Sequence, residues 1–433
     1  MNTIQQLLSG ELKGTKTLKL SCELKEFPNE IFDLAETLEI LDLSGNQLSQ
    51  LPHNFNDLKK LKIAFFSDNN FIHFPEVLAK CSNLTMIGFK SNKIEFISEH
   101  AFPINLQWLI LTNNCINQLP KSIGNCLKLQ KVALAGNKLS SLPHEMSQCK
   151  NIELLRISAN QISEFPEWLF ELPRLSWLAF SGNPCTKIIN LKNELPIISW
   201  NELNIKEILG EGASGIISKA EWTYESAKKE IAVKVFKGEV TSDGFPEDEM
   251  NACILAGHHK NLVTVIGKIK NHPEQKMGLV LELIPSNFKN LAGPPSFDTC
   301  TRDTFPLGVN FSISTIFNIT KAIANAMRHL HSKGIMHGDL YAHNTLIDEH
   351  ANAIFGDFGA ASFYDISSEA STNFERIDVR AFGCFIDDLL NQNFEQENSL
   401  KQSLIHLKND CMQNSILKRP SFEEINQRLN STS

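Results

Sequence analysis

The sequence predicts a solenoid of stacked repeats in the first half of the chain and a second, non-repeating domain in the other half. Asparagines recur every 22 or 23 residues, and a fixed period of this length is typical of stacked repeats. The repeat ends after Asn183 and Pro184, and 433 residues are enough for more than one domain. The periodic asparagines are Asn46, Asn69, Asn92, Asn114, Asn137, Asn160 and Asn183.

The composition is that of a folded protein without a broad positive surface. Hydrophobic residues make up 42% and charged residues 21% of the chain, which is usual for a globular protein. Lysine and arginine number 41 against 49 aspartates and glutamates, which gives a net charge of -8 at pH 7. This balance argues against nucleic acid or an anionic membrane as a partner. Any phosphate chemistry must therefore depend on a local site.

The cysteines and the N-terminal segment indicate an intracellular protein. The 10 cysteines are scattered without a CxxC pair, so we expect buried thiols in a reducing compartment rather than a structural zinc. The first residues lack the basic start and long apolar core of a signal peptide. No stretch reaches the roughly 18 uninterrupted apolar residues of a membrane span. We expect a soluble, cytoplasmic protein.

Each repeat contains a short leucine-rich core, then the asparagine, then a leucine-proline pair. In the core, alternate side chains point inward and outward as in a strand, and the asparagine can bond loop backbone that would otherwise be buried without a partner. The pattern resembles the leucine-rich repeat family, which implies an α/β solenoid, and we place about eight repeats of 23 residues at 1–195. One full copy is Leu38, Leu41, Leu43, Asn46, Leu48, Leu51 and Pro52, and an irregular copy with Leu18, Leu20, Cys22, Leu24, Phe27 and Pro28 opens the array as a cap.

The stacked strands should form a curved parallel sheet with a concave face. We expect this face to bind a protein partner, because solenoids commonly use it in that way. A bare scaffold is the alternative, since scattered exposed aromatics need no explanation. The outward residues include Phe65, Lys90, Trp108, Arg156 and Trp177, whereas we expect a core position for Phe66, Phe74, Phe89, Phe96, Phe165 and Phe180.

A glycine-rich turn opens the second domain between two β-rich runs. A dinucleotide-binding turn of the Rossmann type would be followed by a helix, and here a second strand follows. The turn resembles the glycine-rich loop of a protein kinase, in which the backbone comes close to the nucleotide phosphates. The nucleotide-binding residues implied by this resemblance are Gly210, Glu211, Gly212, Ala213, Ser214 and Gly215.

A lysine, a helix glutamate and a hinge follow in the order that is similar to that of protein kinases. Lys234, in Ala-Val-Lys-Val, matches the strand lysine that pairs with the phosphates and with a helix glutamate. We choose Glu249 as that partner, with Glu247 as the alternative. The run that ends in Glu282 and Ile284 resembles the strand leading into the hinge, whose backbone would receive an adenine.

The catalytic chemistry is concentrated in the segment His-Gly-Asp-Leu-Tyr-Ala-His-Asn and the later Asp-Phe-Gly. This resembles the kinase catalytic loop and metal motif in content and spacing. The resemblance implies that Asp339 orients the accepting hydroxyl and takes its proton, while Asn344 and Asp357 hold Mg²⁺ against the phosphates of ATP. Any one of these residues alone could be a solvated loop residue. The ordered set, together with the glycine loop and Lys234, is specific.

The kinase resemblance extends to the C-terminal part. Asp378 and Arg419 match the buried helix aspartate and the closing Arg-Pro of the family, so we place an α+β bilobal kinase domain at 200–430. The opening tryptophan, Trp200, and Trp222 favour the tyrosine-kinase-like group. The cofactors implied are ATP and Mg²⁺.

Several positions depart from the family pattern. Gly338 replaces the arginine that usually reads a phosphate on the activation loop, so we expect activity without loop phosphorylation. Asp357 and Asp378 are only 21 residues apart, which leaves a short platform for a peptide substrate. Tyr341 stands where serine/threonine kinases place a lysine, and His343 where tyrosine kinases often place an arginine.

Three functions therefore remain open at this point. The first is an active protein kinase, with a serine or threonine acceptor favoured over tyrosine and with a partner, substrate or regulator bound to the repeats. The second is a catalytically weak pseudokinase scaffold, which the short activation segment favours. The third is a phosphotransferase for a small molecule, which would also use an HGD…N loop.

Overall fold

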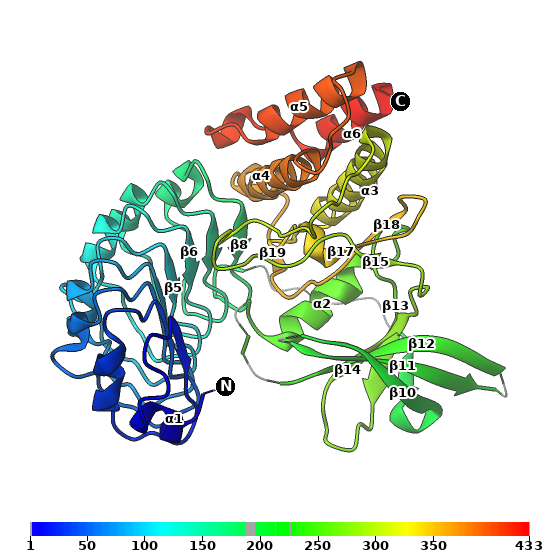
Figure 1. Cartoon of the computed structure of the whole chain (residues 1–433). Helices are drawn as coiled ribbons and strands as arrows, with labels where there is room; N and C mark the ends of the chain where they lie inside the picture. The colour runs from blue at the N-terminus through cyan, green and yellow to red at the C-terminus, as the bar shows by residue number, and fades with distance from the viewer. Residues whose placement is uncertain are drawn as a thin grey trace. The chain divides into compact units, whose positions relative to one another are not determined.

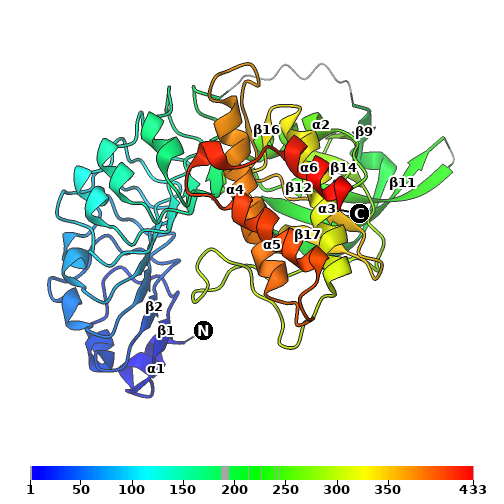
Figure 2. The same cartoon turned by 90° about the horizontal axis from the view of Figure 1, so that it is seen from above.

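A computed structural model of the chain describes residues 2–186, 195–212, 214–225, 227–238, 240–241 and 243–432. These form two compact units. The first comprises Met1–Leu175 with Asn183–Cys185, and the second comprises Ser176–Gly182 with Thr186–Ser433. Figures 1 and 2 show the elements of each unit from two directions. All ten cysteines are free thiols, and within the described ranges no helix is long and apolar enough to cross a membrane.

The first unit is built on short parallel strands, one for each repeat. Leu41 pairs with Leu18 on one side and with Ala64 on the other, so each strand is offset from the next by one repeat period. A helix, α1 (Ile4–Leu8), precedes the array and is capped by Thr3. The strands are β1 (Thr17–Lys19), β2 (Ile40–Asp42), β3 (Ile63–Phe65), β4 (Met86–Gly88), β5 (Trp108–Ile110), β6 (Lys131–Ala133) and β7 (Leu154–Arg156).

The opposite side of most repeats carries a short 3₁₀ helix instead of a strand (Figure 1). Prolines precede most of these helices, where a fixed φ favours a helical start and no backbone donor is lost. These helices span Asn29–Leu34, Phe55–Asp57, Glu76–Lys80, Lys121–Asn125, His144–Gln148 and Glu167–Glu171.

The periodic asparagines form a ladder of buried hydrogen bonds between repeats. The Asn114 side-chain amide donates to the carbonyl oxygens of Phe89, at 2.8 Å, and of Leu111, at 3.0 Å. Its own oxygen accepts from the Ile94 backbone at 2.9 Å. Each asparagine thus satisfies buried backbone groups of two adjacent repeats, which confirms the role expected from the sequence.

Replacing Asn137 with alanine is expected to destabilise the chain by about 3 kcal/mol, because it leaves several buried backbone groups without a hydrogen-bond partner. The side chain donates to Leu111 and Leu134, each at 2.9 Å, and accepts from Ile116 at 3.1 Å. The free energy of unfolding in urea measures the loss. The control is Asn83→Ala, which removes an exposed bond to the Lys59 oxygen and should cost less than about 1 kcal/mol. Equal losses would contradict the ladder.

The aromatic residues of the repeats largely line the interior. Phe66 and Phe89 are fully buried, with their ring centroids 5.0 Å apart. The expectation was wrong for Phe96, whose side chain is 56% exposed, because its loop position turns outward. Phe165 is only half-buried.

Two of the five residues expected on the concave face are buried. Arg156 is 3% and Trp177 1% exposed, and Trp177 belongs to the second unit. Phe65, Lys90 and Trp108 are half-buried. The buried pair therefore cannot offer its side chains to a partner without a change of structure.

The second unit begins with a six-stranded sheet in the order β10-β11-β12-β14-β13-β9. β10 to β12 and β14 run antiparallel to their neighbours, whereas β9 adds parallel to β13. The helix α2 (Pro246–Ala256) packs its Met250 and Ile254 against the residues of β12 and β14. The strands span β9 (Ile197–Ser199), β10 (Leu203–Glu211), β11 (Gly215–Tyr224), β12 (Ala227–Phe236), β13 (Val265–Lys270) and β14 (Gly278–Glu282).

The remainder of the second unit is mainly helical. Its elements are α3 (Ile313–His331), α4 (Ser371–Leu390), α5 (Ser399–Cys411) and α6 (Phe422–Ser431), with the short strands β8 (Trp177–Ala179), β15 (Lys289–Asn290), β16 (Ile335–Met336), β17 (Thr345–Ile347), β18 (Ala353–Phe355) and β19 (Ser362–Phe363). Asp378 of α4 is fully buried and accepts the backbone N–H groups of His337, at 2.7 Å, and Gly338, at 3.1 Å. A sheet-rich lobe and a helical lobe follow a parallel-strand repeat region, which confirms the predicted fold class.

Candidate functional site

The glycine-rich turn connects β10 to β11 as a hairpin. Gly212 donates its backbone N–H to the Gly215 oxygen at 3.0 Å and closes the turn. A Cβ on Gly215 would lie 2.6 Å from the Val235 oxygen, so a side chain there would force the strands apart. Gly210 and Gly212 have open space beside them, and Glu211 is exposed. Ala213 lies outside the described residues.

Lys234 of β12 and Glu249 of α2 form a buried ion pair between Nζ and Oε1. Their side chains are 11% and 2% exposed. The alternative partner, Glu247, lies on the solvent side of the helix. The spacing of two residues on a helix turns Glu247 about 200° away from Glu249, which explains why only one of them can reach the lysine.

Neighbouring carboxylates keep Lys234 protonated although its side chain is buried. Burial by itself lowers the pKa of Lys234, and the carboxylates of Glu249 and Asp357 more than offset this, so its pKa is raised. The lysine is therefore a fixed positive charge in a site of low polarity. Such a charge suits phosphate oxygens.

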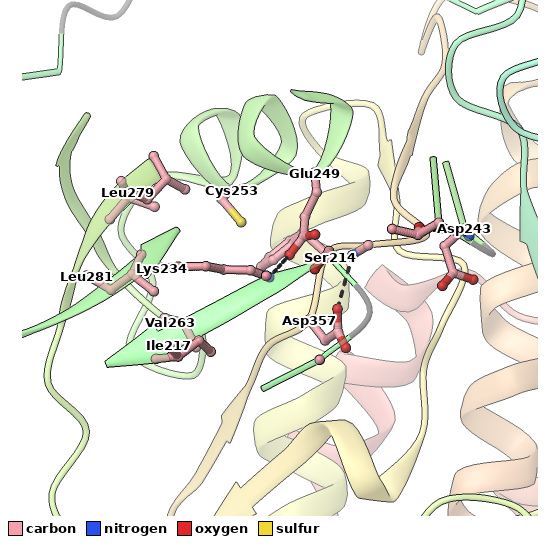
Figure 3. A pocket seen from close by; sticks show the side chains of 16 residues that line it. Ser214, Ile217, Lys234, Asp243, Glu249, Cys253, Val263, Leu279, Leu281 and Asp357 are labelled. Atoms are coloured by element: carbon pink, nitrogen blue, oxygen red, sulfur yellow. Dashed lines mark hydrogen bonds and ion pairs between the residues drawn. The ribbon is translucent and has the colours of Figure 1, made fainter. Parts of the chain in front are cut away.

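A pocket lies between the glycine turn, α2 and the Asp-Phe-Gly segment, and Figure 3 shows its side chains. Lys234 and Glu249 meet at its centre, and Asp357 lies near them in the same view. Asp357 has a left-handed backbone with φ +57, and its Oδ1 accepts the Gly359 N–H at 3.2 Å. Gly212, Ser214 and Gly215 of the expected nucleotide set line the pocket too.

The catalytic loop lies next to this segment and is held together by its own hydrogen bonds. The Asn344 amide donates to the Asp339 carboxylate at 2.8 Å and to its backbone oxygen at 3.0 Å. The backbone oxygen of Asn344 accepts a hydrogen bond, at 3.1 Å, from the backbone N–H of Gly356, the residue directly before Asp357. The hydrogen bonds thus link three of the expected catalytic and metal residues through one short network.

The residues present suit magnesium bound together with a nucleotide. Mg²⁺ is usually held by one or two side-chain oxygens plus phosphates and water. Asn344 and Asp357 provide side-chain oxygens for such a site. Among the described residues no group of three or more His, Cys, Asp or Glu side chains could hold a metal by itself. Phosphate oxygens would therefore have to complete the coordination.

Two residues expected near the adenine do not line the pocket. Glu282 ends β14 with an exposed side chain, and Ile284 is half-exposed beyond it. The backbone of Glu282 donates to the Thr264 oxygen at 2.9 Å. The apolar residues that line the pocket are Ile217, Val263, Val265, Leu279 and Leu281, together with Phe358.

Sequence reasoning missed several residues around the site. Thr241, Asp243 and Cys253 line the pocket, and burial raises the pKa of the Cys253 thiol, which keeps it neutral. Asp303 accepts the Ala342 N–H at 2.6 Å. The position of Cys253, four residues after Glu249 on one helix face, could have pointed to the pocket. Asp303 lies in an irregular loop with no motif around it.

Asp303 also binds His343, and this pair gives a pH prediction. The His343 Nδ1 lies 2.6 Å from the Asp303 Oδ1. Burial lowers the pKa of His343, but the hydrogen bond and charge of Asp303 outweigh it, so the pKa is raised from 6.5. Because the pKa of His343 is higher in the folded state than in the unfolded state, the pair stabilises the folded protein fully below about pH 6.5. This stabilisation is lost as the pH rises through the pKa of His343 in the folded state.

The substitution His343→Asn tests this pair, because asparagine keeps a hydrogen-bond donor but cannot become charged. The difference in unfolding free energy from wild type should be largest below about pH 6.5 and shrink at higher pH. Urea unfolding from about pH 5.5 to 9 measures it. His350→Asn, at a side chain that is 77% exposed, is the control. A difference that stays constant over this range would rule out the charged pair.

Comparison with known proteins agrees with the geometry. The family model described as protein tyrosine and serine/threonine kinase matches residues 203–382, and leucine-rich repeat models match 37–58 and 127–184. A probable serine/threonine-protein kinase of Dictyostelium discoideum is 25% identical over 53% of this chain and 28% of its own length. A second kinase of that name, from Arabidopsis thaliana, is 31% identical over 24% of this chain and 13% of its own.

A probable LIM domain-containing serine/threonine-protein kinase of Dictyostelium discoideum is 26% identical over 52% of this chain and 38% of its own length. The chain thus spans between 13% and 38% of the length of these three relatives. The kinase match includes Lys234, Glu249, Asp339, Asn344 and Asp357, the residues that the structure places around the pocket and its adjoining loop. This chain combines leucine-rich repeats with a protein kinase domain of the tyrosine and serine/threonine kinase family.

Proposed function

We propose that this chain is an ATP-dependent protein kinase that phosphorylates serine or threonine side chains of a protein. The observation that carries the proposal is the formed Lys234–Glu249 pair beside Asp357, with Asp339 and Asn344 bonded to each other in the adjoining loop. These are the parts that phosphoryl transfer requires, namely charge neutralisation and a held nucleophile.

In the proposed reaction, Asp339 orients the acceptor hydroxyl and receives its proton as the oxygen bonds to the γ-phosphorus of ATP. The bond from that phosphorus to the β–γ bridging oxygen breaks, and ADP leaves. Lys234 binds the phosphates, while Gly212 and Ser214 lie close to them in the glycine turn. Mg²⁺, held by Asn344 and Asp357, would neutralise phosphate charge.

The serine or threonine preference and the location rest on separate support. The curated relatives described above are named as serine/threonine kinases. Tyr341 occupies the position where serine/threonine kinases place a lysine, so phosphoamino acid analysis decides between serine, threonine and tyrosine as the acceptor.

The free cysteines support a reducing compartment, which we propose is the cytoplasm. We also propose that the half-buried residues of the concave face, including Trp108, bind a protein partner.

The test incubates the full chain with γ-labelled ATP, Mg²⁺ and a generic protein substrate, followed by phosphoamino acid analysis. Labelled phosphoserine or phosphothreonine is the expected result, and Asp339→Asn is the inactive control. ATP binding without transfer by the wild type would overturn the proposal in favour of a scaffold. Transfer only to small molecules, with no label on protein, would overturn it in favour of a small-molecule phosphotransferase.

A further inference from the structure

A short segment of the second unit, Ser176–Gly182, packs on the catalytic loop through a buried tryptophan. The indole Nε1 of Trp177 donates to the Leu340 oxygen at 3.0 Å. Its ring stacks on Tyr341, with centroids 4.5 Å apart and planes 6° from parallel. Trp177 is 1% and Tyr341 4% exposed. Trp177 therefore contacts the two residues that directly follow Asp339.

The same segment explains why residue 338 is a glycine. Gly338 has φ +70, and a Cβ there would lie 2.3 Å from the Leu178 oxygen and 2.9 Å from the Ala360 oxygen. Both the backbone conformation and the space exclude a side chain. The arginine that usually precedes the catalytic aspartate is thus replaced by the backbone of Leu178.

A second set of contacts reaches the activation segment. The Ser362 hydroxyl is fully buried and accepts the backbone N–H groups of Phe180, at 2.9 Å, and Ser181, at 3.1 Å. The ring of Phe180 also lies 5.0 Å from that of Phe374 in α4. Ser362 belongs to β19, which pairs with β16 just before the catalytic loop. The segment thus contacts β19 and α4 as well as the catalytic loop.

Residues 176–182 therefore contact the catalytic loop through Trp177 and the activation segment through Phe180 and Ser181.

The activation segment itself offers a phosphate few useful places. Ser362 and Tyr364 are buried, and the Tyr364 hydroxyl lies 2.9 Å from the His331 Nδ1. The exposed or half-exposed hydroxyls are Ser367, Ser368, Ser371 and Thr372, close to the start of α4. Order in this segment must come from contacts that are already present.

We propose that Ser176–Gly182 is a built-in positioning segment that keeps the catalytic loop and activation segment in the arrangement for phosphoryl transfer, with Trp177 as its central positioning residue. This rests on the proposed kinase function. The contacts coexist with the formed Lys234–Glu249 pair and the β16–β19 pairing, so the segment stabilises an assembled site. It takes the role that an activation-loop phosphate has in kinases that carry the arginine.

The test uses full-length variants and measures kcat and the KM for ATP. Trp177→Ala is expected to lower kcat about tenfold or more while the KM for ATP stays within about twofold, because Trp177 does not line the nucleotide pocket. Trp177→Phe keeps a stacking ring but loses the donor to Leu340, so it should recover part of the rate. Phe96→Ala, at an exposed aromatic of the repeats, is the control and should leave kcat unchanged.

Two further measurements keep the result clear if Trp177→Ala folds poorly. Ser362→Ala removes the acceptor of Phe180 and Ser181 without changing the segment itself, and it should also lower kcat. Hydrogen exchange at residues 335–345 should become faster in Trp177→Ala and not in Phe96→Ala. Hydrogen exchange tests the positioning role of Trp177 even if the wild type transfers no phosphate. Absence of transfer by the wild type would overturn the proposed kinase function and leave the positioning role standing.

Other outcomes would overturn the inference. If the wild type is active and all three variants at Trp177 and Ser362 match it, the segment positions nothing. If Trp177→Ala is faster than wild type, the segment blocks the site instead of assembling it. A fall in rate that is as large in Trp177→Phe as in Trp177→Ala, with hydrogen exchange unchanged in both, would also contradict positioning through Leu340 and Tyr341.

Discussion

Asp339→Asn is expected to lower the phosphoryl-transfer rate by about 10³-fold while ATP still binds. A general base that takes a proton in the transition state contributes about 10² to 10⁴ in rate. Asparagine keeps the shape and can still contact Asn344, but it cannot accept the proton of the substrate hydroxyl. Because Asp339 does not line the nucleotide pocket, nucleotide affinity should change little.

Asp357→Asn separates the two roles. This residue lines the pocket and is expected to hold Mg²⁺, so its loss should weaken the magnesium-dependent part of ATP binding as well as the rate. Single-turnover rates and ATP binding with and without Mg²⁺ measure both effects. Asp298→Asn, in an exposed loop, serves as the control. If Asp339→Asn transfers phosphate at a near wild-type rate, the catalytic assignment is wrong.

Removing the exposed hydroxyls of the activation segment should change the rate less than the substitutions at Asp339 and Asp357. Replacing Ser367, Ser368, Ser371 and Thr372 together with alanine should change kcat by less than about twofold, because Gly338 offers no arginine for a phosphate there. Steady-state kinetics on a generic substrate measure it. A loss of tenfold, about 1.4 kcal/mol, would show that phosphorylation of this segment matters.

The repeats could be predicted closely because their information is local and repeated. Each asparagine bonds backbone one period away, so a spacing of 22 or 23 residues in the sequence translates directly into the register of β1 to β7. Phe96 shows the limit of this reasoning. Its repeat position resembles that of core residues, yet its side chain is exposed, because the direction of a loop side chain depends on the local turn.

The site could be predicted only where short motifs carry the chemistry. The motifs place Lys234, Asp339, Asn344 and Asp357 in the correct order, and the structure gathers them around the pocket and its loop. Asp303 and Trp177 could not be found in this way. Each acts across a long sequence separation, on His343 and on Tyr341, and no local pattern reports such a contact.

Lys234→Met should both slow phosphoryl transfer strongly and destabilise the protein. The rate should fall by about 10² to 10³-fold, as when a charge that stabilises a transition state is removed. Removing one partner of a buried ion pair leaves the other charge without compensation, and this costs about 3 to 5 kcal/mol. The side chain of Glu249 is 2% exposed, so water cannot replace the lysine.

The double variant Lys234→Met with Glu249→Gln distinguishes stability from catalysis. Without the buried carboxylate, much of the lost free energy of unfolding should return, whereas the transfer rate should stay as low as in Lys234→Met because no lysine faces the phosphates. Urea unfolding and the transfer assay are made on the same preparations. Lys228→Met is the matched control on the same strand, since its pair with Glu221 is exposed, and it should leave both quantities near wild type. A double variant as unstable as Lys234→Met alone would show that lysine packing, and not charge, holds α2 against β12.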